Sequence, residues 1–315
     1  MTRYILSSFG QFLLTLVGVA ILIFLLLRVA PGDVVEVKMR SGGAVVSADT
    51  IARERTRLGL DKPLPNQFVD WMSGLSHFDL GKSMWTERPV VEEISTRIGI
   101  TLEVAVLALV IGLAVALPLG IASALSNGSW LDQAIRVFSV AGLSAPPFWL
   151  GMLLLLALLL SIGWQPPIKT ISWSENPIGH LSQLICPALV VGWRLSATIA
   201  RMLRSSLLDV LNEDYVRTAR SKGLPERLVI IRHALGNALL PAITVAGLEF
   251  AFLLGGLVVT EQVFNLNGVG RLLVQAVGQS DFTLIQGLVL MFAVFFMVVN
   301  FAVDLLYAVL DPRLR

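Results

Sequence analysis

The stretch TLEVAVLALVIGLAVALPLGIASAL, residues 101–125, contains one charged side chain, Glu103, in 25 positions. The hydrocarbon core of a bilayer is about 30 Å thick, and a helix needs about 20 mostly apolar residues to cross it. The stretch therefore predicts a transmembrane helix. Pro118 interrupts the backbone hydrogen bonding of this helix. The freed groups must be satisfied inside protein or beside water, so we expect the helix to belong to a packed bundle.

Five further stretches of the chain have the same character. Charged residues make up only 15% of the 315 residues, whereas a soluble domain has about 25%. The N-terminal stretch ends in Arg28-Val29-Ala30-Pro31, which offers no clean cleavage site. We therefore expect this stretch to be retained and not removed as a secretory signal. The sequence thus predicts an all-α integral membrane protein with six transmembrane helices. The other five are expected at about 9–29, 136–161, 185–203, 240–259 and 284–309.

The polar residues argue against several classes of site. Cys186 is the only cysteine, so an internal disulfide and a cysteine metal cluster are both excluded. His77, His180 and His233 lie far apart and show no metal-ligand spacing, so no metal site is predicted. A net charge of +2 gives no reason to expect a nucleic-acid partner. No paired aspartates and no H-E-x-x-H motif occur, so no catalytic residue is predicted and a membrane-embedded enzyme is disfavoured.

The distribution of Lys and Arg predicts the orientation. Cytoplasmic loops are enriched in these residues when the loops are short. Segment 201–240 carries seven of them, the N-terminus adds Arg3, and the C-terminal tail adds Arg313 and Arg315. The short loops on the other side hold only Lys169 and Arg271. We therefore expect both termini and segment 201–240 in the cytoplasm, and the long segment 31–99 outside.

The outer segment is expected to be helical. Ser47-Ala48-Asp49 offers N-caps for a helix that ends at Leu58, with Gly59 as its stop. A second helix, opened by Pro63 and Pro65, carries an apolar face that includes Phe68 and Trp71. That face is expected to pack on the outer ends of this chain's own helices. The alternative is that part of it meets a solute-delivering partner.

Two glycine-rich motifs in the chain fail as nucleotide sites. Gly81-Lys82-Ser83 resembles the end of a phosphate-binding loop, but Ser76 stands where that loop needs glycine. Gly268-Val269-Gly270 is followed by Leu273 where the dinucleotide pattern needs a third glycine. Nucleotide binding by this chain is therefore not predicted.

The inner segment predicts a short helix over 213–223. Asn212 is a suitable N-cap, acidic residues occupy the first turn and basic residues the last, and Gly223 suits a left-handed stop. Tyr215 and Ala219 share one face, and the small Ala219 would let another protein approach closely. The residues leave two interpretations open. The helix is either an amphipathic connector on lipid headgroups or a docking helix for a cytoplasmic partner.

The residues of this segment resemble a known family. DYVRTARSKGL at 214–224 and RHALGNALLP at 232–241 are similar to the cytoplasmic signature loop of binding-protein-dependent ABC importer permeases. LGLDKPLP at 58–65, DLGKS at 79–83, TEQVFNLNGVG at 260–270, and the closing Asp304–Tyr307 and Leu310–Arg313 resemble the first permease subunit of the dipeptide/oligopeptide/nickel branch. The match runs over nearly the whole chain. Arg217-Thr218-Ala219 replaces the wider family's Glu-Ala-Ala, and the distance from Gly223 to Pro241 is longer than usual, as is typical of that branch.

The resemblance implies a type I ABC importer permease fold in the bacterial inner membrane. It implies three parts: residues 1–30 with the first transmembrane helix, a helical extracytoplasmic segment 31–99, and a permease core 100–315 with a cytoplasmic coupling loop 204–240. Helix 213–223 would be the coupling helix. The residues implied in its contact with an ATPase are Tyr215, Arg217, Thr218, Ala219, Lys222 and Gly223.

The resemblance also implies partners. They are a second homologous permease chain, two cytoplasmic ATPase subunits that bind Mg-ATP, a solute-binding protein outside, and membrane lipid. No cofactor is expected in this chain itself. A peptide is the first expectation for the solute. Nickel chelates, oligosaccharides, opines and glutathione are alternatives, because closely similar permeases carry them.

Arg194 and Glu249 lie well inside the apolar sequence of predicted transmembrane helices, and Asp304 lies in the sixth. A charge at the centre of a helix costs roughly 2.5–3.5 kcal/mol on the insertion scale, so each is expected to face protein or water. They either form pairs, for example Arg194 with Glu249, or line a solute path. A rival function, an ion-gradient-driven transporter, would be expected to show internal repeats, and the two halves of this chain show none.

Overall fold

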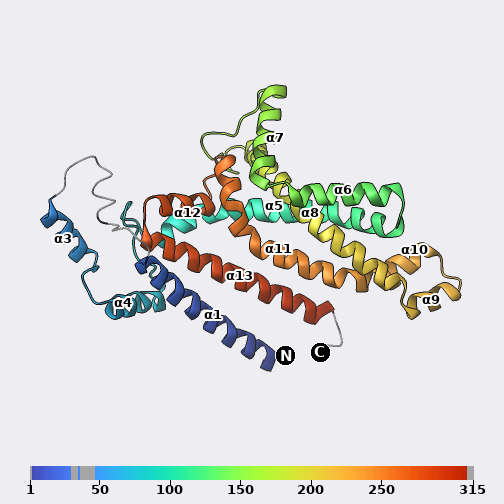
Figure 1. The fold of residues 1–315 in the computed structure, drawn as a ribbon, viewed down its shortest axis with the longest axis horizontal. Coiled ribbons are helices and arrows are strands. Elements are labelled where there is room, and N and C mark those ends of the chain that lie inside the picture. Colours follow the sequence, from blue (N-terminus) through green and yellow to red (C-terminus); the bar gives the residue numbers. More distant parts are fainter. Residues whose placement is uncertain (1, 30–34, 36–46, 311–315) are drawn as a thin grey trace. The chain divides into compact units, whose positions relative to one another are not determined.

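The computed structural model describes residues 2–29, 35 and 47–310 (Figure 1). The predictions for the C-terminal Asp311, Pro312, Arg313 and Arg315, and for the start of the outer segment at 31–34 and 36–46, lie outside the described residues. In the described ranges the chain is helical, and the one strand-like pairing is an isolated bridge between Lys82 and Pro89.

The chain forms two compact units. One comprises Met1–Gly99 with Asn267–Phe295, and the other comprises Ile100–Leu266 with Phe296–Arg315. Residues 267–295 thus cluster with the N-terminal part of the chain. The division into three parts stays a prediction.

Within the described residues, five helices are long and apolar enough to span a membrane, and they confirm five of the predicted stretches. Each is longer than predicted. Asn176 caps the helix that begins at Pro177: its side chain accepts a hydrogen bond from Gly179 N at 2.9 Å, well before the apolar run begins. Polar sequence at both ends therefore continues the helices beyond the hydrocarbon. The five are α1 (Thr2–Val29), α5 (Val90–Leu125), α8 (Pro177–Leu211), α11 (Leu235–Val263) and α13 (Phe282–Leu310).

The stretch 136–161, predicted as one helix, forms two helices. The prediction of one continuous helix is therefore wrong. Helices α6 (Trp130–Ser144) and α7 (Pro147–Ile162) meet at an angle of 102°. Ala145 has an extended backbone with ψ of 126°. A residue before proline is pushed out of the helical region, and two successive prolines remove two N–H donors. Counted as one broken span, α6 and α7 supply the sixth crossing.

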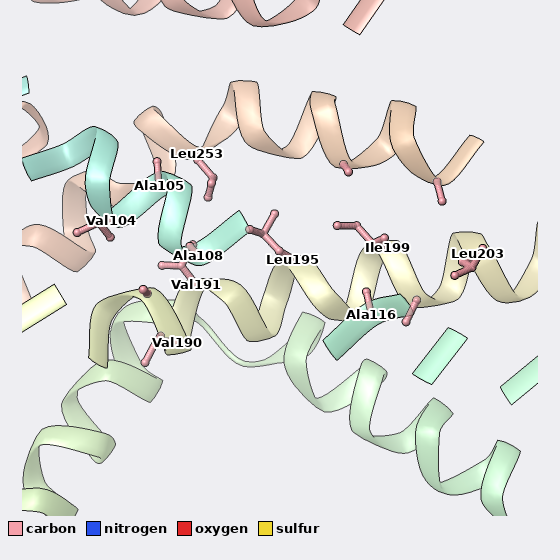
Figure 2. Packing of buried hydrophobic residues seen from close by; sticks show 14 of the residues in the cluster. Val104, Ala105, Ala108, Ala116, Val190, Val191, Leu195, Ile199, Leu203 and Leu253 are labelled. Carbon is pink, nitrogen blue, oxygen red and sulfur yellow. The ribbon is translucent and has the colours of Figure 1, made fainter. Parts of the chain in front are cut away.

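The core of the second unit forms where α5, α8 and α11 meet (Figure 2). Ala108 of α5 faces Gly192 of α8, where an added Cβ would lie 3.0 Å from the Ala108 carbonyl oxygen. A Cβ on Gly112 would lie 2.9 Å from the Leu195 Cβ. Small residues let helix backbones approach closely in a membrane, where packing replaces the hydrophobic effect. These positions therefore hold α5 against α8.

The first unit contains α3 (Ala48–Arg57), α4 (Leu64–Ser76) and α12 (Val269–Gly278). Ser47 caps α3 and Gly59 follows it with a φ of +68°, as predicted. The α4 side chains Phe68 and Trp71 lie 5.2 and 5.9 Å from the Phe24 ring of α1. The outer apolar face thus packs on this chain's own helix. Helix α12 was not predicted.

Ser83 has a structural role. It is 2% exposed, and its Oγ donates to Asp281 Oδ2 at 2.5 Å. Asp281 also accepts from the backbone N–H groups of Met84 and Leu284, each at 3.1 Å. The G-K-S motif therefore ties the outer segment to the start of α13, which agrees with its rejection as a phosphate loop.

Candidate functional site

The inner segment consists of three short helical elements between α8 and α11, at the same end of both helices (Figure 1). They are α9 (Asp214–Ser221), α10 (Glu226–Leu228) and a π-helical turn, η1 (Val229–Ala234). Gly223 has a φ of +75°, which confirms the predicted left-handed stop. Asn212 is not the N-cap. It ends α8, donating from Nδ2 to the Leu208 carbonyl at 3.0 Å, and Glu213 occupies the N-cap of α9.

The apolar face of α9 is covered by this chain. Val216 and Ala219 are buried together with Val229 of η1. We predicted that Ala219 would leave room for another protein, but it is 5% exposed and faces inward. Its small side chain instead lets α9 approach its own connection to α11. A connector resting on lipid would need this face toward the bilayer, and here the chain itself covers it.

Polar contacts fix α9 at both ends. The Arg220 guanidinium donates to both carboxylate oxygens of Glu226, at 2.7 and 3.2 Å, and to the Leu211 carbonyl at 3.3 Å. Its hydrogen bond to Glu226 raises the pKa of Arg220. Asn237 Nδ2 of α11 donates to the Tyr215 hydroxyl at 2.8 Å. Helix α9 is therefore tied to the end of α8, to α10 and to α11.

The rest of the α9 surface is open. Tyr215 is 41% exposed, and Arg217, Thr218, Lys222 and Gly223 are exposed as well. Arg217 makes only a long contact of 3.6 Å with Asp214, whose side chain is almost fully exposed. This surface, which we call the α9 outer face (Tyr215, Arg217, Thr218, Lys222 and Gly223), is polar and basic on a helix held in place from behind.

A buried ion pair was missed by the sequence reasoning. Asp132, at the start of α6, is fully buried and accepts from Arg204 Nε at 2.8 Å and Nη2 at 2.9 Å. Ser123 Oγ donates to it at 2.6 Å, and Gly128 N at 3.1 Å. Arg204 also donates to Asn127 at 2.9 Å. This cluster joins α8 to the α5–α6 connection. The two charges are 72 residues apart, and no local pattern links them.

The three intramembrane charges are not brought together. Arg194 and Asp304 are exposed and Glu249 is half-buried. In the described part of the chain, no ion pair joins Arg194 to Glu249. The exposed side of α8 around Arg194 also carries Thr198, half-buried, and the exposed Arg201 and Ser205, which follow at helical spacing. The pairing that we predicted within the chain is therefore not formed.

Comparison with known families settles the class of protein. The model for the binding-protein-dependent transport system inner membrane component matches residues 116–315, and the model for the N-terminal part of such membrane components matches residues 1–105. The chain belongs to this family. It is the permease subunit of a binding-protein-dependent ABC importer, which excludes the ion-gradient-driven alternative.

Relatives of this permease match over its whole length. A Brucella abortus protein named as a peptide transport system permease is 40% identical to this chain. The match covers 100% of this chain and 99% of the Brucella protein. The glutathione transport system permease protein GsiC of Pectobacterium atrosepticum is 40% identical with the same coverage. GsiC of Salmonella typhimurium is 39% identical, again with that coverage.

Solved structures of ABC transporters share the fold of the permease. A structure of the inward-facing MetNI methionine transporter matches 69% of this chain and 95% of its own, with a TM-score of 0.53 and 17% identity. A structure of an amino acid ABC transporter with histidines matches 71% of this chain and 94% of its own, with a TM-score of 0.51 and 16% identity. These matches confirm the predicted all-α type I importer permease fold.

Proposed function

We propose that the α9 outer face is the docking surface for a cytoplasmic ATPase subunit, and that α9 passes the ATPase movement to α8 and α11. One observation carries this proposal: the apolar face of α9 is fully used within the chain, while its polar face is open. Helix α9 is fixed by the contact of Arg220 with Glu226 and by that of Asn237 with the Tyr215 hydroxyl, so it moves together with the helices it joins. Import then follows from rocking of the helix bundle between two states.

The assembly that we propose has this chain paired with a second, homologous permease chain. Two ATPase subunits bind and hydrolyse Mg-ATP, and a binding protein delivers solute from outside. Both termini and α9 face the cytoplasm, in line with the basic residues of segment 201–240. This chain itself then carries no catalytic group for ATP hydrolysis.

A peptide or a similarly small solute is the proposed cargo. The support is the names of the full-length relatives, which refer to peptide and glutathione transport. Glutathione is itself a small peptide with free carboxylates and an amine. In this proposal Arg194, Glu249 and Asp304 contribute to the solute path or to pairing with the second permease chain.

Site-specific crosslinking tests the docking proposal. In a Cys186→Ala background, the importer would be purified with its ATPase subunits after Thr218→Cys is introduced on the α9 outer face. Ser172→Cys, in the exposed α7–α8 connection, is the matched control. A short bifunctional thiol reagent should join Thr218→Cys, and not Ser172→Cys, to an ATPase subunit. Complexes that co-purify intact but give no adduct at position 218 would contradict the proposal.

The same two variants test the orientation. An impermeant thiol reagent added to intact cells should label Ser172→Cys and leave Thr218→Cys unlabelled, and inverted vesicles should show the reverse. The opposite pattern would show that the orientation derived from the basic residues is wrong.

A further inference from the structure

The first unit contains a pocket that the proposed function does not use. It has a volume of about 340 Å³ and lies between the C-terminal end of α1, the α3–α4 connection and the first turns of α13. The side chains that matter for its chemistry come from these elements. They are Phe24, Arg28, Gln67, Trp71, Thr283 and Gln286.

Gln286 is the first sign that this pocket has an occupant. Only 6% of the residue is exposed, yet its side-chain amide makes no hydrogen bond with any described residue. A buried polar group without a partner is unfavourable, and native proteins rarely leave one. An amide held against a cavity wall can donate to, or accept from, a molecule in the cavity.

Arg28 is the second sign. Its Nε is buried without a hydrogen-bond partner, and its guanidinium lies 5.2 Å above the centre of the Phe24 ring. The other two cations of the lining are neutralised: Arg57 contacts Glu54 at 2.6 Å, and Lys62 contacts Asp70 at 2.6 Å. No ion pair to Arg28 is found within the described ranges. Arg28 is therefore the cation whose charge the pocket leaves uncompensated.

The remaining lining residues complete a site of mixed polarity. Gln67 donates from Nε2 to the carbonyls of Leu60 and Lys62, which fixes its amide, while its buried Oε1 has no partner. Thr283 adds a hydroxyl, and the rings of Phe24 and Trp71 form an apolar wall. A planar guanidinium with adjacent amide and hydroxyl donors matches the two oxygens of a carboxylate or phosphate group.

We propose that this pocket binds an oxyanion, a carboxylate or a phosphate, carried on a molecule with an apolar part. Arg28 and Gln286 hold the oxyanion, and the Phe24 and Trp71 rings contact the apolar part. The group has two possible sources, the free carboxylate of a peptide or the phosphate of an anionic phospholipid. This site lies beyond the proposed function, because docking of an ATPase at α9 does not depend on it.

Binding to the assembled importer in a phosphate-free sugar detergent tests the proposal. The probes are short-chain phosphatidylglycerol, a tripeptide with a free C-terminal carboxylate, and the same tripeptide amidated, each titrated by native mass spectrometry. Arg28→Gln should weaken binding of at least one oxyanion probe by about tenfold. Arg53→Gln on α3, an exposed arginine that does not line the pocket, is the matched control and should change nothing.

The arms of this experiment distinguish the two sources. Loss confined to phosphatidylglycerol assigns the site to a lipid phosphate. Loss confined to the free tripeptide, with no binding of its amide, assigns it to a carboxylate. Equal binding of every probe by wild type and Arg28→Gln would overturn the proposal, as would an equal loss in Arg53→Gln.

Gln286→Leu supplies a second readout that does not depend on Arg28. The variant has nearly the same side-chain volume and removes an amide without a partner. It should therefore raise the unfolding temperature of the ligand-free complex while weakening oxyanion binding. Unchanged binding in Gln286→Leu would mean that the amide does not serve a ligand, and the assignment of the site would fail.

Discussion

Two arginines of α8, one at its middle and one near its C-terminal end, have opposite surroundings. Arg204, near the end that leads to α9, forms a two-pronged contact with the fully buried Asp132. Arg194, ten residues earlier and deeper in the apolar sequence, is exposed and has no ion-pair partner in the described part of the chain. A charge inside a membrane protein must face protein or water. The chain neutralises Arg204 by itself and leaves Arg194 to something outside it, which in the proposed assembly is either the second permease chain or a water-filled path.

The largest loss of stability is expected at the ion pair between Asp132 and Arg204. Asp132→Ala leaves the half-buried Arg204 guanidinium with its bond to Asn127 but without its counter-ion, and should cost about 3–5 kcal/mol of stability. Chemical denaturation of the purified complex, or loss of assembled importer, measures this. Asp209→Ala, which removes an exposed aspartate from the same helix as Arg204, is the control and should change little. Similar stabilities for the two variants would show that the Asp132 cluster is not what holds α6 to α8.

A smaller effect is expected at the stop after α9. Gly223→Val forces a branched residue to a φ of +75°, which costs about 1–2 kcal/mol. We expect assembled complex with impaired solute-stimulated ATP hydrolysis and uptake. Gly163, with a φ of +69° and open space around it, is the matched control. Gly163→Val carries the same strain far along the chain from α9 and should keep the coupling intact. Normal uptake by Gly223→Val would remove the coupling role from α9.

A change at Arg194, in the middle of α8, should affect function before it affects stability. Arg194→Gln removes a charge that has no partner within the described chain, so its unfolding midpoint should stay near wild type. Uptake should fall while basal ATP hydrolysis is retained if Arg194 lines the path. If the importer instead dissociates into separate permease chains, Arg194 pairs across the chain interface. Arg201→Gln, also exposed on α8, is the comparison variant.

The smallest effect is expected for the exposed pair behind α9. Arg220→Gln removes contacts to Glu226 and Leu211 that lie at the water boundary. Exposed ion pairs contribute little, because water and salt screen them. The unfolding midpoint should therefore change by no more than experimental error, and any difference should vanish at high salt. A loss of stability as large as that of Asp132→Ala would show that the exposed Arg220–Glu226 pair contributes as much as the buried Asp132–Arg204 pair.

The sequence predicted what depends on local pattern. Hydropathy located the transmembrane helices, and charge order with Gly223 located α9 and its stop. Ser47 and Gly59 bounded α3 for the same reason. These signals act within a turn or two of the chain, so one sequence contains them in full.

What the sequence did not predict depends on distance or on competition between neighbours. Asp132 and Arg204 meet only because α6 packs on α8. Asn212 suited the start of α9, but α8 continued far enough for Asn212 to end that helix instead. Pro146 and Pro147 were recognisable as helix breakers within 136–161, but the sequence did not give the 102° angle between the two helices that they separate. Whether the α9 outer face and the three intramembrane charges have the roles predicted for them stays a prediction.

The length of α8 has a mechanical consequence. Its 35 residues extend over roughly 52 Å at about 1.5 Å per residue, while the hydrocarbon core is only about 30 Å thick. About 20 Å of stiff helix therefore projects beyond the bilayer, so α8 can act as a lever arm. Tilting such a rod by about 10° around its midpoint moves its end by roughly 4–5 Å. A displacement of about one helical turn at α9 is thus equivalent to a rotation of about ten degrees in the membrane.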